Sequence, residues 1–197
     1  MKINRSTSLP LDKFIEFALY DEDTGYYMKK NPFGKEGDFI TAPNITRLFS
    51  EIIAIWVVTF WKSIGSPKNF NLLELGAGNG EMMKVIISTL KNFPECINNC
   101  NFIIHEKSTF LKRQQQKNLE LDNVKWTDNI KKISNYPTIF LANEFFDALP
   151  IKQFFKRNKG WVERFVDLKK IDQAKFDEQS IDIKEIEKKL NFEISKD

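Results

Sequence analysis

The stretch FNLLELGAGNGEMM, residues 70–83, constrains the fold of this chain more than any other segment. An apolar run ends at three glycines spaced two apart, Gly76, Gly78 and Gly80, and a helix-like pattern begins at Glu81. A strand, a glycine turn and a helix in this order are typical of nucleotide-binding α/β folds. Glycine also lets the backbone approach a ligand closely, because no Cβ stands in the way.

Strand-like and helix-like segments alternate from residue 68 onward. We expect strands at 71–75, 101–106, 123–126 and 138–142 and helices at 81–91 and 108–120. This alternation predicts an α/β fold with a mostly parallel, Rossmann-like sheet and helices on its faces. Two further segments, 151–155 and 161–168, predict a C-terminal antiparallel hairpin that turns at 158–160.

The rest of the chain predicts flanking regions. A helix at 9–20, a long loop at 21–43 and a second helix that begins at Asn44 form an N-terminal extension, residues 1–66, that packs on the cofactor site. The Rossmann-like domain then covers residues 67–168, and a charged tail covers 169–197. In the tail only a short helix around Ile186 is indicated, and we expect no core there.

Composition excludes several classes of protein. With 42% apolar and 29% charged residues in 197, the chain has the composition of one globular domain. The net charge of +3 arises from 30 basic and 27 acidic side chains without a basic stripe, so we expect no nucleic-acid partner. The longest apolar run, residues 52–61, is about half of what a membrane span needs. A structural zinc site needs four ligands, so the pair Cys96 and Cys100, with His105 as the one histidine, is poor evidence for a metal, and we expect none.

The glycine turn must be assigned to a ligand. A dinucleotide motif has glycine at the position of Glu81, whose carboxylate would repel a pyrophosphate. S-adenosylmethionine carries no phosphate, and Glu74 can offer negative charge to its ammonium group. Glu106, twenty-eight residues beyond Gly78, ends the second strand and can bind both ribose hydroxyls. NAD-binding folds use the same device, so Glu106 supports a nucleoside without selecting one.

The end of the third predicted strand is where the adenine ring should lie. Trp126 and Asp128 stand at this position, and Asp128 is the candidate ligand-binding residue. Trp126 is better interpreted as a packed core aromatic.

Polar residues also follow the fourth predicted strand, in TIFLANEFFDALP. Ligands of parallel sheets bind beyond the carboxyl ends of the strands, so Asn143, Glu144 and Asp147 should face the cofactor. Methyl transfer requires an aligned acceptor, and carboxylates hold a guanidinium well. We expect Glu144 as the first catalytic residue, Asp147 as the second and Asn143 as an orienting group. Asp147 equally suits a helix cap, and Glu144 a local ion pair.

Four segments together resemble the MidA family of class I methyltransferases, which depend on S-adenosyl-L-methionine. They are LPLDKFIEFALYDEDTGYY, NPFGKEGDFITAP, LLELGAGNGEMM and LANEFFDALPIKQFF, and the resemblance runs from about residue 8 to about 168. It implies a seven-stranded fold, a protein arginine methyltransferase activity and a role in the assembly of respiratory complex I. The substrate would be a protein such as a complex I subunit, in the mitochondrial matrix of a eukaryote or the cytoplasm of a bacterium.

The resemblance also assigns the long N-terminal loop. In the family fold it would close over the cofactor, which places Asp38 and Thr41 near the methionine end of the ligand; the alternative is that they only order the loop. Family members continue beyond the length of this chain with the rest of the sheet and a substrate-facing region. We therefore expect a C-terminally short member.

Two functions remain open from the sequence. The first is an S-adenosylmethionine-dependent methyltransferase that acts on a protein side chain. The alternative is a non-catalytic assembly or interaction protein that keeps the cofactor fold, or a truncated fragment. An NAD-dependent oxidoreductase is disfavoured by Glu81 and by the position of His105, within a predicted strand. The sequence does not indicate the oligomeric state.

Overall fold

The computed structural model describes residues 8–29, 32–33, 37–119, 123–169 and 174–194. The chain divides into two compact units, one formed by Tyr26–Ala148 and the other by Met1–Gly25 together with Leu149–Asp197. The division into ranges 1–66, 67–168 and 169–197 stays a prediction. No helix within the described ranges is long and apolar enough to cross a membrane.

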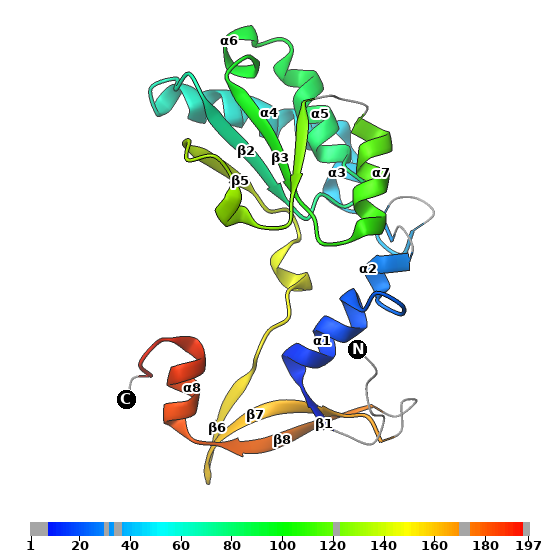
Figure 1. Ribbon diagram of the computed structural model, residues 1–197, viewed down its shortest axis with the longest axis vertical. Helices are drawn as coiled ribbons and strands as arrows, with labels where there is room; N and C mark the ends of the chain where they lie inside the picture. The colour runs from blue at the N-terminus through cyan, green and yellow to red at the C-terminus, as the bar shows by residue number, and fades with distance from the viewer. Residues whose placement is uncertain (1–7, 30–31, 34–36, 120–122, 170–173, 195–197) are drawn as a thin grey trace. The chain divides into compact units, whose positions relative to one another are not determined.

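The unit Tyr26–Ala148 is built on a parallel sheet in the order β4-β3-β2-β5 (Figure 1). Its strands are β2 (Phe70–Leu75), β3 (Cys100–His105), β4 (Val124–Thr127) and β5 (Thr138–Leu141). The expected α/β class with a mostly parallel sheet is therefore confirmed. Strand order reverses at β2, because β3 pairs on one side of it and β5 on the other, and ligands of such sheets bind at this reversal.

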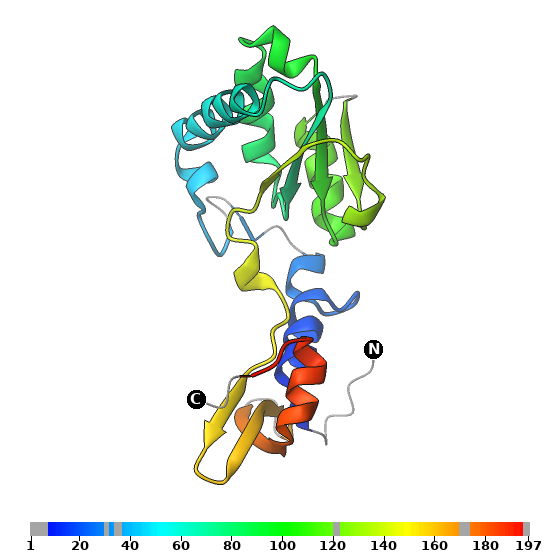
Figure 2. The same ribbon diagram turned by 90° about the vertical axis from the view of Figure 1, so that its left-hand side faces the viewer.

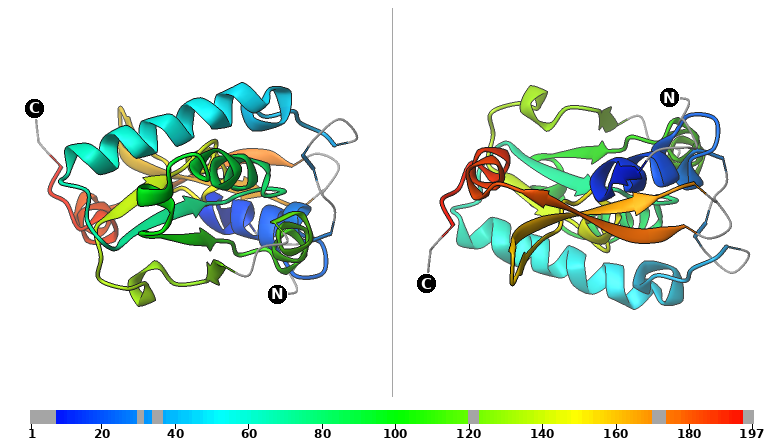
Figure 3. Two further views of the ribbon diagram at one scale, coloured as in Figure 1. Left: turned by 90° about the horizontal axis from the view of Figure 1, so that it is seen from above. Right: turned by 90° about the horizontal axis from the view of Figure 1, so that it is seen from below.

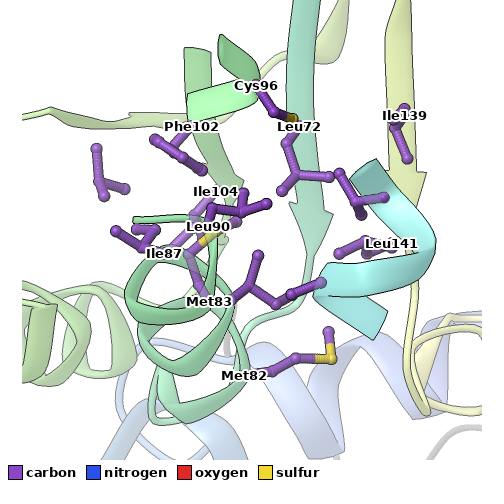
Figure 4. Close-up of a cluster of buried hydrophobic side chains, with 14 of the residues drawn as sticks. Leu72, Met82, Met83, Ile87, Leu90, Cys96, Phe102, Ile104, Ile139 and Leu141 are labelled. Atoms are coloured by element: carbon purple, nitrogen blue, oxygen red, sulfur yellow. The ribbon is translucent and has the colours of Figure 1, made fainter. Parts of the chain in front are cut away.

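Helices α4 and α5 lie on the same side of this sheet (Figure 2). The helices of the unit are α2 (Tyr26–Lys29), α3 (Ala42–Ile45), α4 (Arg47–Ser63), α5 (Glu81–Leu90), α6 (Pro94–Ile97) and α7 (Thr109–Leu119), with 3₁₀ turns η1 (Ile130–Lys132) and η2 (Phe146–Ala148). Apolar residues of α5, such as Met83 and Leu90, face Leu72 and Ile104 of the sheet and form the core (Figure 4).

The start of the second helix differs from the prediction. Asn44 was expected as its N-cap, but α4 begins at Arg47, and the Thr46 hydroxyl accepts the capping hydrogen bond from the Leu48 N–H at 3.2 Å. Asn44 lies in the preceding short helix α3, and its side chain bonds to Thr41 and Asn79 instead. Both residue types are good caps, so sequence alone did not separate them.

The second unit contains an antiparallel sheet with β7 in its middle. β6 (Phe154–Arg157) and β1 (Ser8–Pro10) pair with one edge of β7 (Gly160–Asp167), and β8 (Lys175–Ile181) pairs with the other. The predicted hairpin is confirmed as β6–β7. Helix α1 (Leu11–Tyr20) packs on this sheet through Leu11, close to Val166 and Leu168.

The prediction that no core lies beyond Leu168 is wrong. β8 forms there and is followed by α8 (Ile183–Leu190), whose Ile186 is fully buried. The Lys189 ammonium also lies 2.7 Å from the buried carboxylate of Glu163 in β7. The residues of β8 are almost all exposed, so the strand shows no apolar periodicity from which it could be predicted.

Candidate cofactor and active site

The glycine turn after β2 has a backbone that only glycine adopts readily. Gly76, Gly78 and Gly80 have φ values of +66°, +54° and +85°, all in the left-handed region. At Gly76 a side chain would also collide with a neighbour, because its Cβ would lie 2.7 Å from a ring carbon of Phe145. At Gly78 the ring of Phe33 would be 3.2 Å from a Cβ. The glycines therefore allow the positive φ angles of the turn, and at Gly76 and Gly78 they let the rings of Phe145 and Phe33 lie close to the backbone.

Glu74, the last but one residue of β2, has a buried carboxyl that can still accept a hydrogen bond. It is 3% exposed, and its Oε2 atom has no hydrogen-bond partner among the described residues. Burial, with a smaller contribution from the charge of Glu106, raises the pKa of Glu74 to about 8. A buried carboxyl without partners is costly, so this position suits a ligand group that carries positive charge.

Glu106, directly after β3, is the second acid of the site and is held from both sides. Its Oε1 accepts a hydrogen bond from the Ser108 N–H at 2.8 Å, and its Oε2 accepts one from the Gln115 amide at 2.9 Å. Burial raises the pKa of Glu106, while these two bonds oppose the shift. The carboxylate is thus fixed in orientation at the carboxyl end of β3, as a group that binds two hydroxyls requires.

Gln115 of α7 connects the parts of this site and was not predicted. Its Nε2 donates to the Gly78 carbonyl and to Glu106, each at 2.9 Å, and its Oε1 accepts from Trp126 Nε1 at 2.9 Å. The residue is fully buried. One feature of the sequence could have identified it. Leu111 and Leu119 stand four residues to either side of Gln115 on one face of the helix, and an amide among apolar residues needs polar partners.

The segment before α4 is joined to the glycine turn by asparagines. Asn79 donates to Asn44 Oδ1 at 3.0 Å, and Asn44 donates to the hydroxyl of Thr41 at 2.9 Å. Asn118 of α7 donates to the Asn79 carbonyl at 2.8 Å. Thr41 is buried, and the bonds through Asn44 and Asn79 connect it to the glycine turn. A role near the ligand requires such a position.

Asp38 lies in an aromatic environment and is exposed. Its carboxylate accepts a hydrogen bond from the Tyr26 hydroxyl. Burial and this bond raise the pKa of Tyr26 to about 12. Tyr27 stacks on Phe33 with ring centroids 6.1 Å apart, and Phe33 is the ring that lies over Gly78. The described aromatic residues of this loop thus form a cluster next to the glycine turn.

The acidic residues after β5 lie at the carboxyl edge of the sheet, where β2 also ends. β5 pairs with β2 in a register that places Leu141 opposite Glu74, so Asn143 and Glu144 follow the same strand end. Glu144 has φ +49°, a strained value for a residue with a side chain. Besides burial, the charges of Asp147 and Glu144 raise the pKa of Tyr27, so both acids lie near this ring. Neither acid forms an ion pair within the described ranges.

Trp126 and Asp128 differ in their surroundings. Trp126 packs against the core and bonds to Gln115, as expected of a structural aromatic. Asp128 is exposed after β4, and no described hydrogen bond joins it to the glycine turn. The adenine assignment of Asp128 stays a prediction, as do the catalytic roles of Asn143, Glu144 and Asp147.

The arrangement fits a cationic nucleoside better than a phosphate. Two neighbouring carboxyls, the buried Glu74 and the half-buried Glu106, face a turn at which a Cβ would be in the way. No cationic side chain forms an ion pair with either acid in the part of the chain that is described. The unpartnered oxygen of Glu74 matches an ammonium group, and the fixed carboxylate of Glu106 matches a ribose diol. Both carboxylates act as acceptors, and the ammonium group and ribose hydroxyls of S-adenosylmethionine are donors of this kind.

Comparison with known proteins agrees with this chemistry. "Protein arginine methyltransferase NDUFAF7, mitochondrial" of Xenopus laevis is 30% identical over 191 residues, covering 85% of this chain and 44% of the relative. The human protein of the same name is 28% identical over 191 residues, covering 85% and 43%. The chain thus spans less than half the length of the curated relatives it matches.

Among solved structures, a COG1565 superfamily member from Burkholderia thailandensis, bound to S-adenosyl-homocysteine, aligns with a TM-score of 0.76 at 24% identity. The alignment covers 93% of this chain and 49% of that chain, and it supports the fold. The family model "Putative S-adenosyl-L-methionine-dependent methyltransferase" matches residues 52–196, well over half of the chain. The chain therefore belongs to this family of S-adenosyl-L-methionine-dependent methyltransferases, which confirms the resemblance to the MidA family.

Proposed function

We propose that this chain binds S-adenosylmethionine at the carboxyl ends of β2 and β3 and transfers its methyl group to an arginine side chain of a protein. The observation that carries the proposal is the buried Glu74 carboxyl, whose unpartnered oxygen lies beside Glu106 and the glycine turn. Membership of the family supports the cofactor, and the printed names of the relatives support arginine as the acceptor.

On the cofactor side, each residue has a distinct task. Glu74 would bind the methionine ammonium and Glu106 the ribose hydroxyls, while the backbone of Gly76 and Gly78 allows close approach. When bound, S-adenosylmethionine supplies an electrophilic methyl group, whose bonding electron pair returns to sulfur as the acceptor nitrogen bonds to the methyl carbon. Asp38 and Thr41 would lie toward the methionine end, and Asp128 toward the adenine. Within this set, Glu74 is buried and the carboxylate of Glu106 is fixed by two hydrogen bonds, which aligns a ligand without reorganisation.

On the acceptor side, the proposal rests on the acids after β5. Glu144 and Asp147 would accept hydrogen bonds from a guanidinium, hold its plane and stabilise its positive charge through the transfer. The proton that the methylated nitrogen releases would leave through the exposed carboxylate of Glu144 to water. Asn143 would orient the acceptor. The strained backbone at Glu144 supports a functional position, since such strain is retained where geometry matters.

The wider role is part of the same proposal. The resemblance to the MidA family implies a subunit of respiratory complex I as the protein substrate, and the curated relatives are named mitochondrial. The place of action would be the mitochondrial matrix in a eukaryote or the cytoplasm in a bacterium.

Titration calorimetry with S-adenosylmethionine and S-adenosylhomocysteine, with NAD as the control ligand, tests the cofactor. Gly78→Val should abolish binding of both adenosyl ligands. Gly65→Val is the matched control, because Gly65 has φ +89° but no atom within 4 Å of its Cβ position. Binding that survives Gly78→Val, or that NAD shares, would overturn the cofactor assignment.

Transfer needs a separate experiment. Radiolabelled methyl transfer to an arginine-containing peptide, compared with the same peptide carrying lysine, should depend on Glu144: Glu144→Gln should lower turnover at unchanged cofactor affinity. Cofactor binding without transfer to either peptide or to a complex I preparation would favour the non-catalytic alternative.

A further inference from the structure

Two glycines of the turn after β2 each lie against an aromatic ring. A Cβ at Gly76 would lie 2.7 Å from the ring of Phe145, and a Cβ at Gly78 would lie 3.2 Å from the ring of Phe33. Phe145 belongs to the segment after β5, and Phe33 to the segment between α2 and α3, so the rings reach the turn from distant parts of the sequence. The turn at which we place the cofactor is therefore lined by aromatic rings of this chain.

A third ring, that of Tyr27, extends this lining toward β3. Tyr27 stacks on Phe33 with ring centroids 6.1 Å apart and an interplanar angle of 14°. Its helix α2 lies beside the start of α7 (Figure 3), where the hydroxyl of the buried Ser108 donates to the Tyr27 carbonyl at 2.7 Å. The backbone N–H of Ser108 also donates to Glu106. Tyr27 and Phe33 thus reach from the turn after β2 to the residues that follow β3. We name Tyr27, Phe33 and Phe145 the aromatic set.

The sulfonium of S-adenosylmethionine has to lie in the same span. Its sulfur is bonded to the methyl group, to the side chain of the methionine part and to C5′ of the ribose, so it stands between the ammonium group and the ribose hydroxyls. With the ammonium at Glu74 and the hydroxyls at Glu106, the sulfur would lie between the carboxyl ends of β2 and β3. We propose that the faces of the aromatic set bind this sulfonium, an assignment that rests on the proposed function.

The chemistry of these rings suits a cation. The face of an aromatic ring is electron-rich and attracts a positively charged ligand group, more strongly where water is excluded. The three rings are half-buried and lie outside the hydrophobic core of the unit. Burial raises the pKa of Tyr27, and the charges of Asp147 and Glu144 raise it further, so the surroundings of this ring favour positive charge.

Such a subsite distinguishes the methyl donor from its product. When the methyl group leaves, the electron pair of the broken bond returns to sulfur, and S-adenosylhomocysteine has no positive charge there. The attraction to the rings is lost with that charge, whereas the contacts of the ammonium group and the ribose are the same in both ligands. The aromatic set should therefore strengthen binding of the donor relative to the product and favour release of the product.

The ratio of the dissociation constants of the two ligands, measured by titration calorimetry, tests this assignment. Phe33→Leu and Phe145→Leu each keep an apolar side chain but remove a ring, and each should weaken S-adenosylmethionine binding about fivefold more than S-adenosylhomocysteine binding. Phe39→Leu and Phe146→Leu are the matched controls and should leave the ratio unchanged. Both residues are exposed and contact a ring of the set, but neither is the nearest neighbour of a turn glycine.

The outcomes separate this assignment from the proposed function. Equal losses for the two ligands would mean that the rings only order the site, which overturns the sulfonium subsite and leaves the cofactor assignment standing. The same change of ratio in the control variants would also overturn it. If the unsubstituted chain binds neither ligand, the proposed cofactor is wrong and the subsite is wrong with it.

A second measurement keeps the ring in place. Fluorinated phenylalanines of nearly unchanged shape, introduced at Phe33, withdraw electron density from the ring face in steps. The affinity for S-adenosylmethionine should fall with each added fluorine, while the affinity for S-adenosylhomocysteine stays nearly constant. A donor affinity that does not depend on the number of fluorines would overturn the role of Phe33 in binding the sulfonium.

Discussion

The amide of Gln115 and the carboxylate of Glu106 are joined by a hydrogen bond of 2.9 Å, and the same amide nitrogen also donates to the carbonyl of Gly78. A single side chain of α7 therefore fixes both the acid after β3 and the turn after β2. A group that holds two elements of the proposed cofactor site in register controls their spacing, although it does not itself need to contact the ligand.

Replacing Gln115 with methionine should weaken S-adenosylhomocysteine binding about tenfold. The substitution keeps the volume but removes the donor to Glu106 and the acceptor for Trp126, and it leaves the Gly78 carbonyl without this partner. Gln116→Met is the matched control, since Gln116 is exposed on the same helix. Calorimetry of both variants measures the effect, and equal affinities would contradict a positioning role for Gln115.

Glu74 should make the ligand-free protein less stable as pH rises. In the unfolded chain its pKa lies near 4.5, whereas in the folded protein burial raises it to about 8. Its contribution is therefore fully present below pH 4.5 and is lost as pH rises toward 8, by up to a few kcal/mol. Urea unfolding at several pH values measures the slope, which Glu74→Gln should flatten. Parallel slopes for the two proteins would contradict this assignment.

Binding of S-adenosylhomocysteine should release a proton from Glu74. An ammonium at the carboxyl favours its ionised form, and at about pH 6.5 the amino group of the ligand is already protonated. Calorimetry in two buffers of different ionisation enthalpy should report the release of about one proton per site. In Glu74→Gln this release should disappear. Release of the same amount from the variant would place the titrating group elsewhere.

The sheet and its two acids could be predicted because their signals are local. The alternation of strands and helices marks β2 to β5, and the position of an acid at a strand end depends only on neighbouring residues. The apolar stripe of α7 could have marked Gln115 as a buried amide, but its role could not be assigned this way, since its partners Gly78 and Glu106 belong to other elements. A buried amide is recognised as a hub only when the fold brings its partners together.

The second unit shows a different limit of sequence analysis. β8 consists almost entirely of exposed residues and forms because β7 offers it an edge along its whole length. Such a strand has no apolar face, so it cannot be predicted from an alternation of apolar and polar residues. The tail differs from β8, because the spacing of Ile183, Ile186 and Leu190 does indicate a short helix. What the sequence did not indicate is that Ile186 is fully buried and that Lys189 pairs with Glu163 of β7.

Alanine at Gly76 should destabilise the protein more than alanine at Gly65. Both positions have positive φ, which costs an L-residue about 1 kcal/mol. Only Gly76 adds a steric term, because its Cβ would lie 2.7 Å from the Phe145 ring, whereas the Cβ position at Gly65 is open. We expect a difference of roughly 1 kcal/mol in the free energy of unfolding, measured by chemical denaturation. Equal costs would mean that the Phe145 ring moves aside freely.

Truncation of Ile186 tests whether the C-terminal helix is part of the folded second unit. Ile186→Ala removes a fully buried side chain and should lower the free energy of unfolding by about 3 kcal/mol, since a cavity remains. Leu190→Ala, in the same helix, is the matched control: Leu190 is 48% exposed, so its loss should cost less than about 1 kcal/mol. Thermal and urea unfolding of both variants measure the difference. If the two substitutions cost the same, α8 would not be anchored through Ile186, and the sequence-based expectation of a coreless tail would describe the protein better.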